Sequence, residues 1–180
     1  MLASNPRLVP SNRSLAALLS GPARRAATPA AERTTLVNQG GGAYNHALYF
    51  TQLAPTGANI AMPADLDAAL GGGNKTAATL DAWQKAAVGV FGSGWSWLTL
   101  APNRSLVVTT SANQENPITK GDGIPIAGLD VWEHSYYLTY GALRADHVSA
   151  LVKNNMNWTQ VDANLKAARK GDADAALAPA

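Results

Sequence analysis

The sequence predicts an α+β fold in which helices flank a three-stranded antiparallel sheet. Apolar residues recur at helical spacing up to residue 91 and again after residue 133, whereas β-branched and aromatic runs lie between these two zones. The order of elements is therefore helices, sheet, helices, which is an α+β arrangement. With 180 residues, 47% of them hydrophobic, the chain is long enough for one sizeable core and too short for two.

The first 34 residues differ in composition from the rest. Residues 1–31 contain four Arg and four Ser but no Asp or Glu, which is typical of a mitochondrial or plastid transit segment. The alternative is a disordered, alanine-rich tail. We therefore expect residues 1–34 to form a transit-like or extension segment, and the location to be mitochondrial, with the plastid as the second choice.

A helix is predicted from about Thr35 to a point before Pro55, because Leu36, Tyr44 and Leu48 can share one of its faces. Its three consecutive glycines, residues 40–42, each disfavour a helix by about 1 kcal/mol relative to alanine. They therefore require a packing reason.

Two further helices are predicted after a loop over residues 55–63. The first opens at Pro63 and stops at the glycines 71–73. The second spans residues 76–91, and its apolar positions in phase are Leu80, Trp83, Ala87 and Phe91.

Three strands follow the break at residues 92–94. They are predicted over residues 95–100, 105–110 and 124–131, with a hairpin turn at residues 102–104 between the first two. Helices then recur over residues 134–140, 146–153 and 161–170, and residues 171–180 are an alanine-rich tail that is expected to fray.

Composition excludes several function classes. The chain has no cysteine, so disulfides and thiolate metal sites are excluded, and any metal must use His, Asp or Glu. A formal net charge of +2 does not provide the basic field that nucleic-acid binding needs. No apolar run approaches the roughly 20 residues that span a bilayer, so no membrane insertion is expected.

Three residues form a candidate metal site. Asp130 ends a predicted strand and His134 enters the next helix, so the turn between them can direct both side chains to one centre, with His46 as a third ligand. Two His and one carboxylate suit iron or manganese with open coordination positions. By spacing alone, however, a buried His is more often a hydrogen-bonded core residue than a metal ligand.

Four segments make the metal site specific, because together they resemble the iron/manganese superoxide dismutase family in both order and spacing. They are GGGAYNH at residues 40–46, GSGWSWL at 92–98, ANQENP at 112–117 and DVWEHSYY at 130–137. The resemblance covers roughly residues 35–170. It implies that residues 35–62 are a remnant of the family's N-terminal helical hairpin and that residues 63–170 are its C-terminal domain.

The resemblance also implies roles for seven residues. His46, Asp130 and His134 would bind manganese, or alternatively iron. Gln114 would hydrogen-bond the metal-bound solvent, Trp95 and Trp132 would wall the site, and Glu133 would reach His134 of a second subunit, so that a dimer completes the site. Manganese is favoured because iron enzymes commonly place the glutamine at the position occupied here by Gly42, whereas this chain has Gln114.

The chain also departs from the family pattern. Family members begin with a helix that supplies another His ligand, but residues 1–34 contain no His and no Tyr. The first helix and its ligand are therefore expected to be absent from this chain. His147 stands where the family usually has Tyr and is not assumed to replace that ligand. Arg144 is the candidate cation for attracting superoxide, or else a salt-bridge partner of Asp146.

Two functions follow from these observations. The first is an antioxidant superoxide dismutase that converts superoxide to oxygen and hydrogen peroxide at a His/Asp-bound metal. The second is a non-catalytic, dismutase-like subunit of a larger mitochondrial assembly, such as a ribosome or a respiratory complex, which would need no metal. A two-His-one-carboxylate oxygenase has no support beyond the three ligands.

Overall fold

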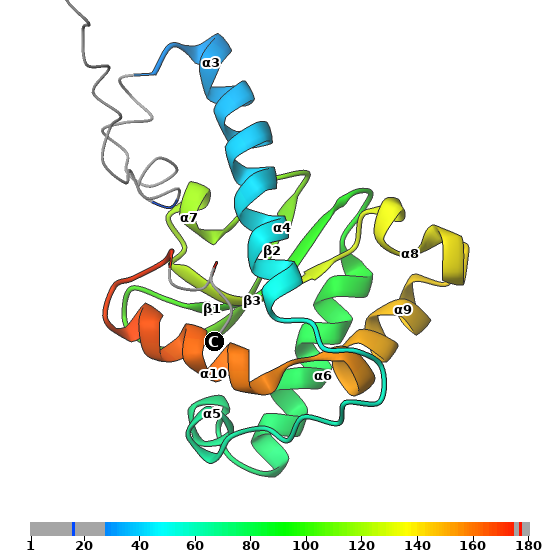
Figure 1. Ribbon diagram of the computed structural model, residues 1–180. Coiled ribbons are helices and arrows are strands. Elements are labelled where there is room, and N and C mark those ends of the chain that lie inside the picture. Colours follow the sequence, from blue (N-terminus) through cyan, green and yellow to red (C-terminus); the bar gives the residue numbers. More distant parts are fainter. Residues whose placement is uncertain (1–15, 17–27, 175–176, 178–180) are drawn as a thin grey trace, which may run out of the picture.

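The computed structural model describes residue 16, residues 28–174 and residue 177. Most of the predicted transit-like segment, residues 1–15 and 17–27, lies outside the described residues. Within the described part, helices surround one three-stranded antiparallel sheet, as Figure 1 shows. The predicted α+β fold class is therefore confirmed.

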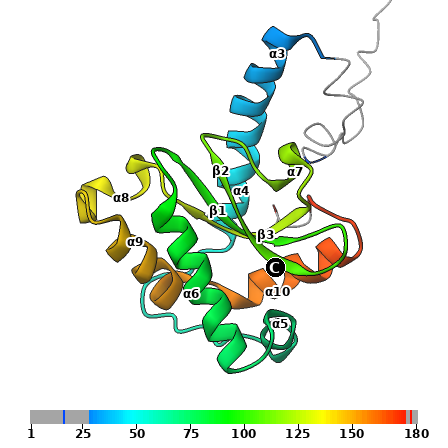
Figure 2. The ribbon, with the colours of Figure 1, turned by 180° about the vertical axis from the view of Figure 1, so that it is seen from behind.

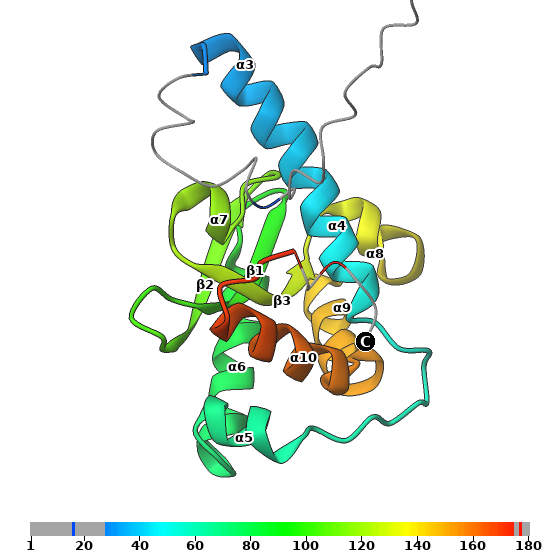
Figure 3. The ribbon, with the colours of Figure 1, turned by 60° about the vertical axis from the view of Figure 1, so that its left-hand side comes forward.

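A long helix carries His46. It comprises α3 (Ala30–Thr35), a π-helical stretch η1 (Leu36–Gly41) and α4 (Gly42–Thr51). The helix begins five residues earlier than predicted, because Pro29 is extended and the alanines after it favour helix. Its first part has no buried residue and extends beyond the sheet (Figures 1 and 3).

The glycines of this helix have the packing reason that the sequence requires. A Cβ atom on Gly41 would lie 2.3 Å from the backbone oxygen of Gln114, and one on Gly42 would lie 3.4 Å from the Gln114 side chain. Only glycine therefore lets the helix approach the turn that carries Gln114. The π-helical stretch ends at this same contact.

Two helices follow an irregular linker, as predicted. They are α5 (Ala64–Leu70), which ends at Gly71 with φ of 115°, and α6 (Asn74–Gly89). The predicted helix end at Phe91 is wrong, because α6 stops at Gly89 and Val90 is extended, and the Phe91 side chain is fully exposed. Trp83 and Ala87 are buried as expected.

The sheet has the order β2-β1-β3, and both pairings are antiparallel. The strands are β1 (Gly94–Leu100), β2 (Leu106–Ala112) and β3 (Ile124–Asp130). Every residue of the central strand is buried. Helix α6 packs against β1 and β2, whereas α4 packs against β3 on the opposite face, as the views from the front and from behind show (Figures 1 and 2).

A short helix that the sequence analysis missed lies between β2 and β3. This helix, α7 (Pro117–Lys120), is stabilised by a capping box in which the Asn116 side chain accepts a hydrogen bond from the amide of Thr119. Four residues are too few for a periodic pattern, but Asn followed by Pro is a helix-start signal that could have identified it.

The C-terminal helices agree with the predicted ones within a few residues. They are α8 (Glu133–Tyr140), α9 (Arg144–Ala150), the π-helical η2 (Leu151–Asn155) and α10 (Trp158–Arg169). Helix α10 also packs on β3. Among the described residues, no helix is long and apolar enough to cross a membrane.

The C-terminal tail, for which fraying stays a prediction, has contacts with the rest of the chain over residues 171–174. The hydroxyl of the fully buried Tyr44 donates a hydrogen bond to the carbonyl oxygen of Ala173, at 2.7 Å. The carboxylate of Asp174 accepts one from the backbone amide of Ala16, at 2.8 Å. A buried tyrosine hydroxyl needs a partner, and the tail supplies it.

The contact between Gly41 and Gln114 predicts the effect of a substitution. Gly41→Ala should lower the free energy of unfolding by about 1–3 kcal/mol, the usual cost of overpacking, because its new methyl group meets a backbone atom. Urea unfolding measures this change.

Gly89→Ala is the matched control, because a Cβ atom there meets nothing within 4 Å. It should leave stability unchanged or raise it by about 0.5–1 kcal/mol, since alanine favours helix. Equal destabilisation by both substitutions would contradict the packing argument.

Candidate metal centre

Three elements bring the three predicted ligands together. His46 lies in α4, Asp130 is the last residue of β3, and His134 lies in the first turn of α8. Each offers one ligand atom, and these atoms all lie within 4.8 Å of one another. His46 thus meets Asp130, which lies 84 positions later in the sequence, because α4 and α8 both pack at the end of β3 (Figure 3).

Asp130 is at the centre of this group. Its side chain is 1% exposed, and its Oδ2 lies 3.1 Å from Nε2 of His134 and 3.6 Å from Nε2 of His46. Its Oδ1 accepts a hydrogen bond from the backbone amide of Trp132, at 2.9 Å. Burial raises the pKa of the Asp130 carboxyl, whereas the Trp132 amide and the two imidazoles act in the opposite direction.

The hydrogen bonding of His46 orients its free nitrogen. Its Nδ1 lies 2.8 Å from the carbonyl oxygen of Gly42, one helical turn earlier, and a carbonyl can only accept. Nδ1 of the neutral ring therefore carries the hydrogen, and Nε2 presents a lone pair towards Asp130. A lone pair that faces a carboxylate oxygen favours a shared cation between the two atoms.

The two distances from Asp130 to the imidazoles are those of ligand atoms that share one ion. Metal–ligand distances of about 2.0–2.2 Å, as found for zinc with the same donor atoms, place adjacent ligand atoms about 3–3.6 Å apart. The two distances from Asp130 Oδ2 are 3.1 and 3.6 Å. Two imidazole nitrogens and one carboxylate oxygen are also the donor set that iron and manganese accept with positions left open.

Two tryptophans lie against the ligand rings. Trp95 is fully buried and meets the ring of His46 edge-on, with 5.2 Å between centroids. Trp132 stacks on His134 at 5.5 Å, and its Nε1 donates a hydrogen bond to the carbonyl oxygen of Asn113. Nε1 of Trp95 has no hydrogen-bond partner among the described residues, so a buried donor lies beside the group.

Gln114 lies next to α4 rather than in the group of three. The side-chain amide nitrogen Nδ2 of Asn45 donates hydrogen bonds to the side-chain oxygen of Gln114, at 3.3 Å, and to its backbone oxygen, at 3.2 Å. Asn45 is the neighbour of His46 in sequence and is fully buried. Gln114 therefore contacts the helix that positions a ligand, and in the described chain its side chain forms no hydrogen bond to the three ligands.

A buried amide network that the sequence analysis missed joins these elements. The side chain of Asn116 donates to Oδ1 of Asn45, at 2.8 Å, and both residues are fully buried. Asn45, Gln114 and Asn116 thus connect α4 to the turn after β2. All three lie within the segments that carry the family resemblance. These side-chain amides could therefore have been identified from the sequence as candidates for a shared network.

One side of the group is open to the surface. The side chains of His46 and His134 are 31% and 52% exposed, in contrast to Asp130. Phe50, one turn after His46, is 67% exposed. Glu133 is exposed at the start of α8 and forms no ion pair within the described chain.

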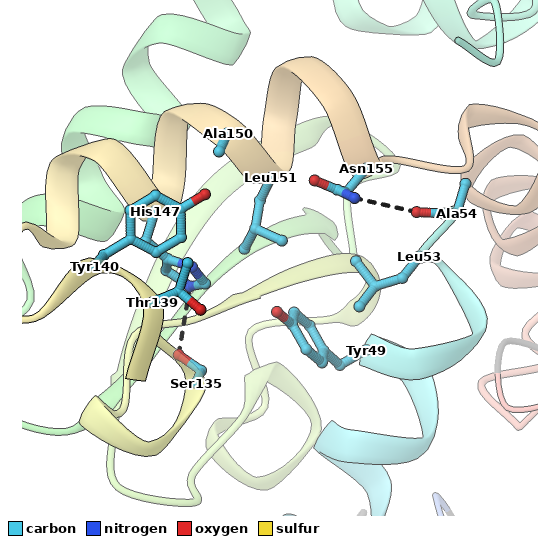
Figure 4. Close-up of a pocket in the computed structure, with 10 residues that line it drawn as sticks. All are labelled: Tyr49, Leu53, Ala54, Ser135, Thr139, Tyr140, His147, Ala150, Leu151 and Asn155. Carbon is cyan, nitrogen blue, oxygen red and sulfur yellow. Dashed lines mark hydrogen bonds between the residues drawn. The ribbon is translucent and has the colours of Figure 1, made fainter. Parts of the chain in front are cut away.

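His147 does not join the three ligands. It is buried in α9, and its Nε2 lies 3.1 Å from the backbone carbonyl oxygen of Asp130 rather than near the carboxylate. Burial lowers the pKa of His147. The ring also lines a cavity of about 260 Å³ between α4, α8 and α9, which Figure 4 shows together with Tyr49 and Tyr140.

Of the two roles predicted for Arg144, the salt bridge with Asp146 is wrong, whereas attraction of superoxide stays a prediction. Its guanidinium donates to the carbonyl oxygens of Val90 and Gly92 and to the hydroxyl of Tyr136. These bonds connect α9 to the segment before β1, and within the described chain Arg144 forms no ion pair with Asp146. Arg144 therefore stabilises the fold, because its donors face backbone acceptors instead of solvent.

Comparisons with known proteins agree with this geometry. The model of the family described as "Iron/manganese superoxide dismutases, C-terminal domain" matches residues 63–164. A protein named superoxide dismutase [Mn] from Pseudomonas aeruginosa is 42% identical over 139 residues, which are 76% of this chain and 66% of the relative.

Two further relatives are similar. A superoxide dismutase [Mn] from Bordetella pertussis is 43% identical over 127 residues, which are 69% of this chain and 58% of the relative. A superoxide dismutase [Mn/Fe] from Methylomonas sp. (strain J) is 41% identical over 124 residues, which are 69% of this chain and 60% of the relative.

This chain thus spans 58–66% of the length of these three curated relatives. The family model, by contrast, matches more than half of the chain and includes Asp130 and His134. On these findings, the chain belongs to the iron/manganese superoxide dismutase family.

Proposed function

We propose that the protein is a superoxide dismutase that binds manganese or iron through His46, Asp130 and His134. The convergence of these three ligand atoms within 4.8 Å is the observation that carries the proposal. Conversion of two superoxide ions and two protons to oxygen and hydrogen peroxide needs a redox-active ion, and that is the chemistry the metal supplies. The names of the relatives support the same activity.

The charge of the ligand set favours an anionic substrate. Asp130 contributes one negative charge, and the two imidazoles bind as neutral ligands. A divalent or trivalent ion therefore keeps a net positive charge at this site. Because the side chains of His46 and His134 are partly exposed, superoxide can approach the centre from that side.

Manganese is the proposed metal, and the packing of Gly42 supports the choice. A Cβ atom on Gly42 would lie 3.4–3.6 Å from the side chain of Gln114. The two positions at which the family places its glutamine are thus adjacent in space, and a long side chain at position 42 would compete with Gln114. Gln114 then supplies the hydrogen bond to metal-bound solvent, while Trp95 and Trp132 limit access of water.

The proposed dimer uses the exposed face of α8. Glu133 is exposed there, and Tyr137 and Leu138 are 56% and 101% exposed, although large apolar side chains are usually covered. In the proposed dimer, this face meets a second copy and Glu133 reaches His134 of the partner. A mitochondrial location rests only on the composition of residues 1–34.

No observation favours the second function, a subunit of a mitochondrial assembly. The relatives carry the names of enzymes, and the three ligand residues are present with compatible spacing. A non-catalytic subunit would have no chemical need for this arrangement.

Removal of the central carboxylate should abolish metal binding. Asp130→Asn should reduce affinity by more than the roughly 10- to 100-fold that is typical of losing an outer hydrogen-bond partner. Metal content after dialysis and competition with a chelator measure the effect. Asp146→Asn, a change at an exposed carboxylate in α9, is the control and should leave affinity unchanged. Full retention of metal by Asp130→Asn would contradict the assignment of Asp130.

Metal affinity should fall as the pH is lowered. All three ligands must be deprotonated to bind, and burial raises the pKa of Asp130, so protons compete with the ion at a higher pH than for an exposed aspartate. The loss should follow the deprotonated fraction of the ligands and reverse when the pH is restored. Titrations with Mn²⁺ across the acidic range measure it, and a pH-independent affinity would argue against His and Asp ligands.

The metal-loaded chain should consume superoxide, and His46→Ala should lose this activity together with its metal, whereas Asp146→Asn should keep both. A direct assay of superoxide decay, corrected for free Mn²⁺ by a chelator, measures the rate. Stoichiometric metal without superoxide consumption would overturn the dismutase proposal while preserving the metal site.

A further inference from the structure

His147 contacts the backbone carbonyl of Asp130, at the start of the segment that leads from Asp130 to His134. Its Nε2 lies 3.1 Å from the carbonyl oxygen of Asp130, although the two residues are 17 positions apart and belong to different elements. A carbonyl can only accept a hydrogen bond, so Nε2 of His147 must carry the hydrogen. The tautomer of His147 thus follows from its surroundings.

Ser135 acts on the same carbonyl group. Its hydroxyl lies 2.7 Å from the carbonyl oxygen of Trp132, 3.0 Å from that of Asp130 and 3.4 Å from Nε2 of His147. The hydroxyl can donate to one carbonyl and still accept from His147. Two side chains, one from α8 and one from α9, therefore converge on the backbone of Asp130.

The imidazole of His147 is held firmly in this position. The ring is stacked on Tyr136, with 5.2 Å between centroids, and Tyr140 packs against it at 5.7 Å. The residue is only 4% exposed. Figure 4 shows the ring beside Tyr140, with a dashed line from its nitrogen to Ser135. A ring restrained in this way keeps its Nε2 facing the Asp130 carbonyl and the Ser135 hydroxyl.

The carbonyl that His147 binds belongs to the turn on which the site depends. The turn runs from the end of β3 to the start of α8 and carries both Asp130 and His134. Within it, Oδ1 of Asp130 accepts from the Trp132 amide, which leaves Oδ2 to face the two imidazoles. The orientation of this peptide therefore decides where the carboxylate and His134 meet.

We propose that His147 is a positioning residue of the metal centre. The hydrogen bond from its Nε2 to the Asp130 carbonyl, supported by Ser135, holds the turn in the geometry in which Asp130 and His134 share one ion. This inference rests on the proposed function, in that the same residues must bind the metal. It assigns a role to a histidine that stands where the family usually has tyrosine.

The side chain of histidine suggests a matched set of variants. Glutamine carries its amide nitrogen the same number of bonds from Cα as Nε2 of histidine, whereas asparagine carries it one bond closer. Phenylalanine keeps a ring but has no donor. The cavity of about 260 Å³ that His147 lines leaves room for these side chains to adjust.

Binding of Co²⁺ and Mn²⁺ to His147→Gln, His147→Asn and His147→Phe tests the proposal. The Asn and Phe variants should bind about 10- to 100-fold more weakly than the unchanged chain, as is typical when an outer hydrogen bond to a metal ligand is lost. His147→Gln should recover most of the affinity. The visible absorption of bound Co²⁺ should shift in the Asn and Phe variants and return towards the original spectrum in the Gln variant.

Urea unfolding of the metal-free variants separates positioning from folding. If His147 only fills space, the metal affinity of each variant would follow its side-chain volume and its free energy of unfolding. The Gln variant would then bind metal no more tightly than the Asn variant. Equal affinities for Gln and Asn, or unchanged affinity and spectrum in all variants, would overturn the proposal. Should Phe fail to fold, the comparison of Gln with Asn still decides it.

Metal binding by the unchanged chain separates the proposed function from the proposed role of His147. If it binds Co²⁺ and Mn²⁺ but the His147 variants bind equally well, only the positioning role fails. If it binds neither ion, the proposed function fails, and the role of His147 fails with it.

Discussion

The buried carboxylate of Asp130 is the interaction on which the rest of this structure depends. An ionised group that is 1% exposed is costly unless charge and hydrogen bonds compensate for it. The surrounding elements provide this compensation through the Trp132 amide and the two imidazoles, while Ser135 and His147 contact the backbone carbonyl of the same residue. A metal ion between Oδ2 and the imidazoles would complete it. Strand β3, α4, α8 and α9 all meet at this residue.

Close packing of α4 makes this meeting possible. Its glycines allow the turn after β2 to approach, and a hydrogen bond between the buried side-chain amides of Asn45 and Asn116 connects the two elements. At the other end of α4, the buried Gln52 exchanges hydrogen bonds with both backbone groups of Gly128 in β3. The helix is therefore fixed to the sheet before and after His46, which determines where that imidazole points.

The family relationship and the local geometry explain different parts of the molecule. The match over residues 63–164 accounts for the sheet and for Asp130 and His134, whereas His46 lies outside it on a helix that packs from the opposite side of the turn. Two further contacts lie around this site. Tyr44 binds the C-terminal tail, and His147, which departs from the family pattern, binds the backbone of Asp130.

The sequence by itself determined the three strands, most helices and the set His46, Asp130 and His134, because periodicity and short motifs are local signals. It did not reveal that Phe91 is exposed, that Arg144 binds backbone carbonyls, that the tail packs on Tyr44, or that His147 faces the Asp130 carbonyl. Only the tertiary structure decided these points. Each depends on which distant group lies opposite a side chain, and that proximity follows from the packing of whole elements rather than from neighbouring residues.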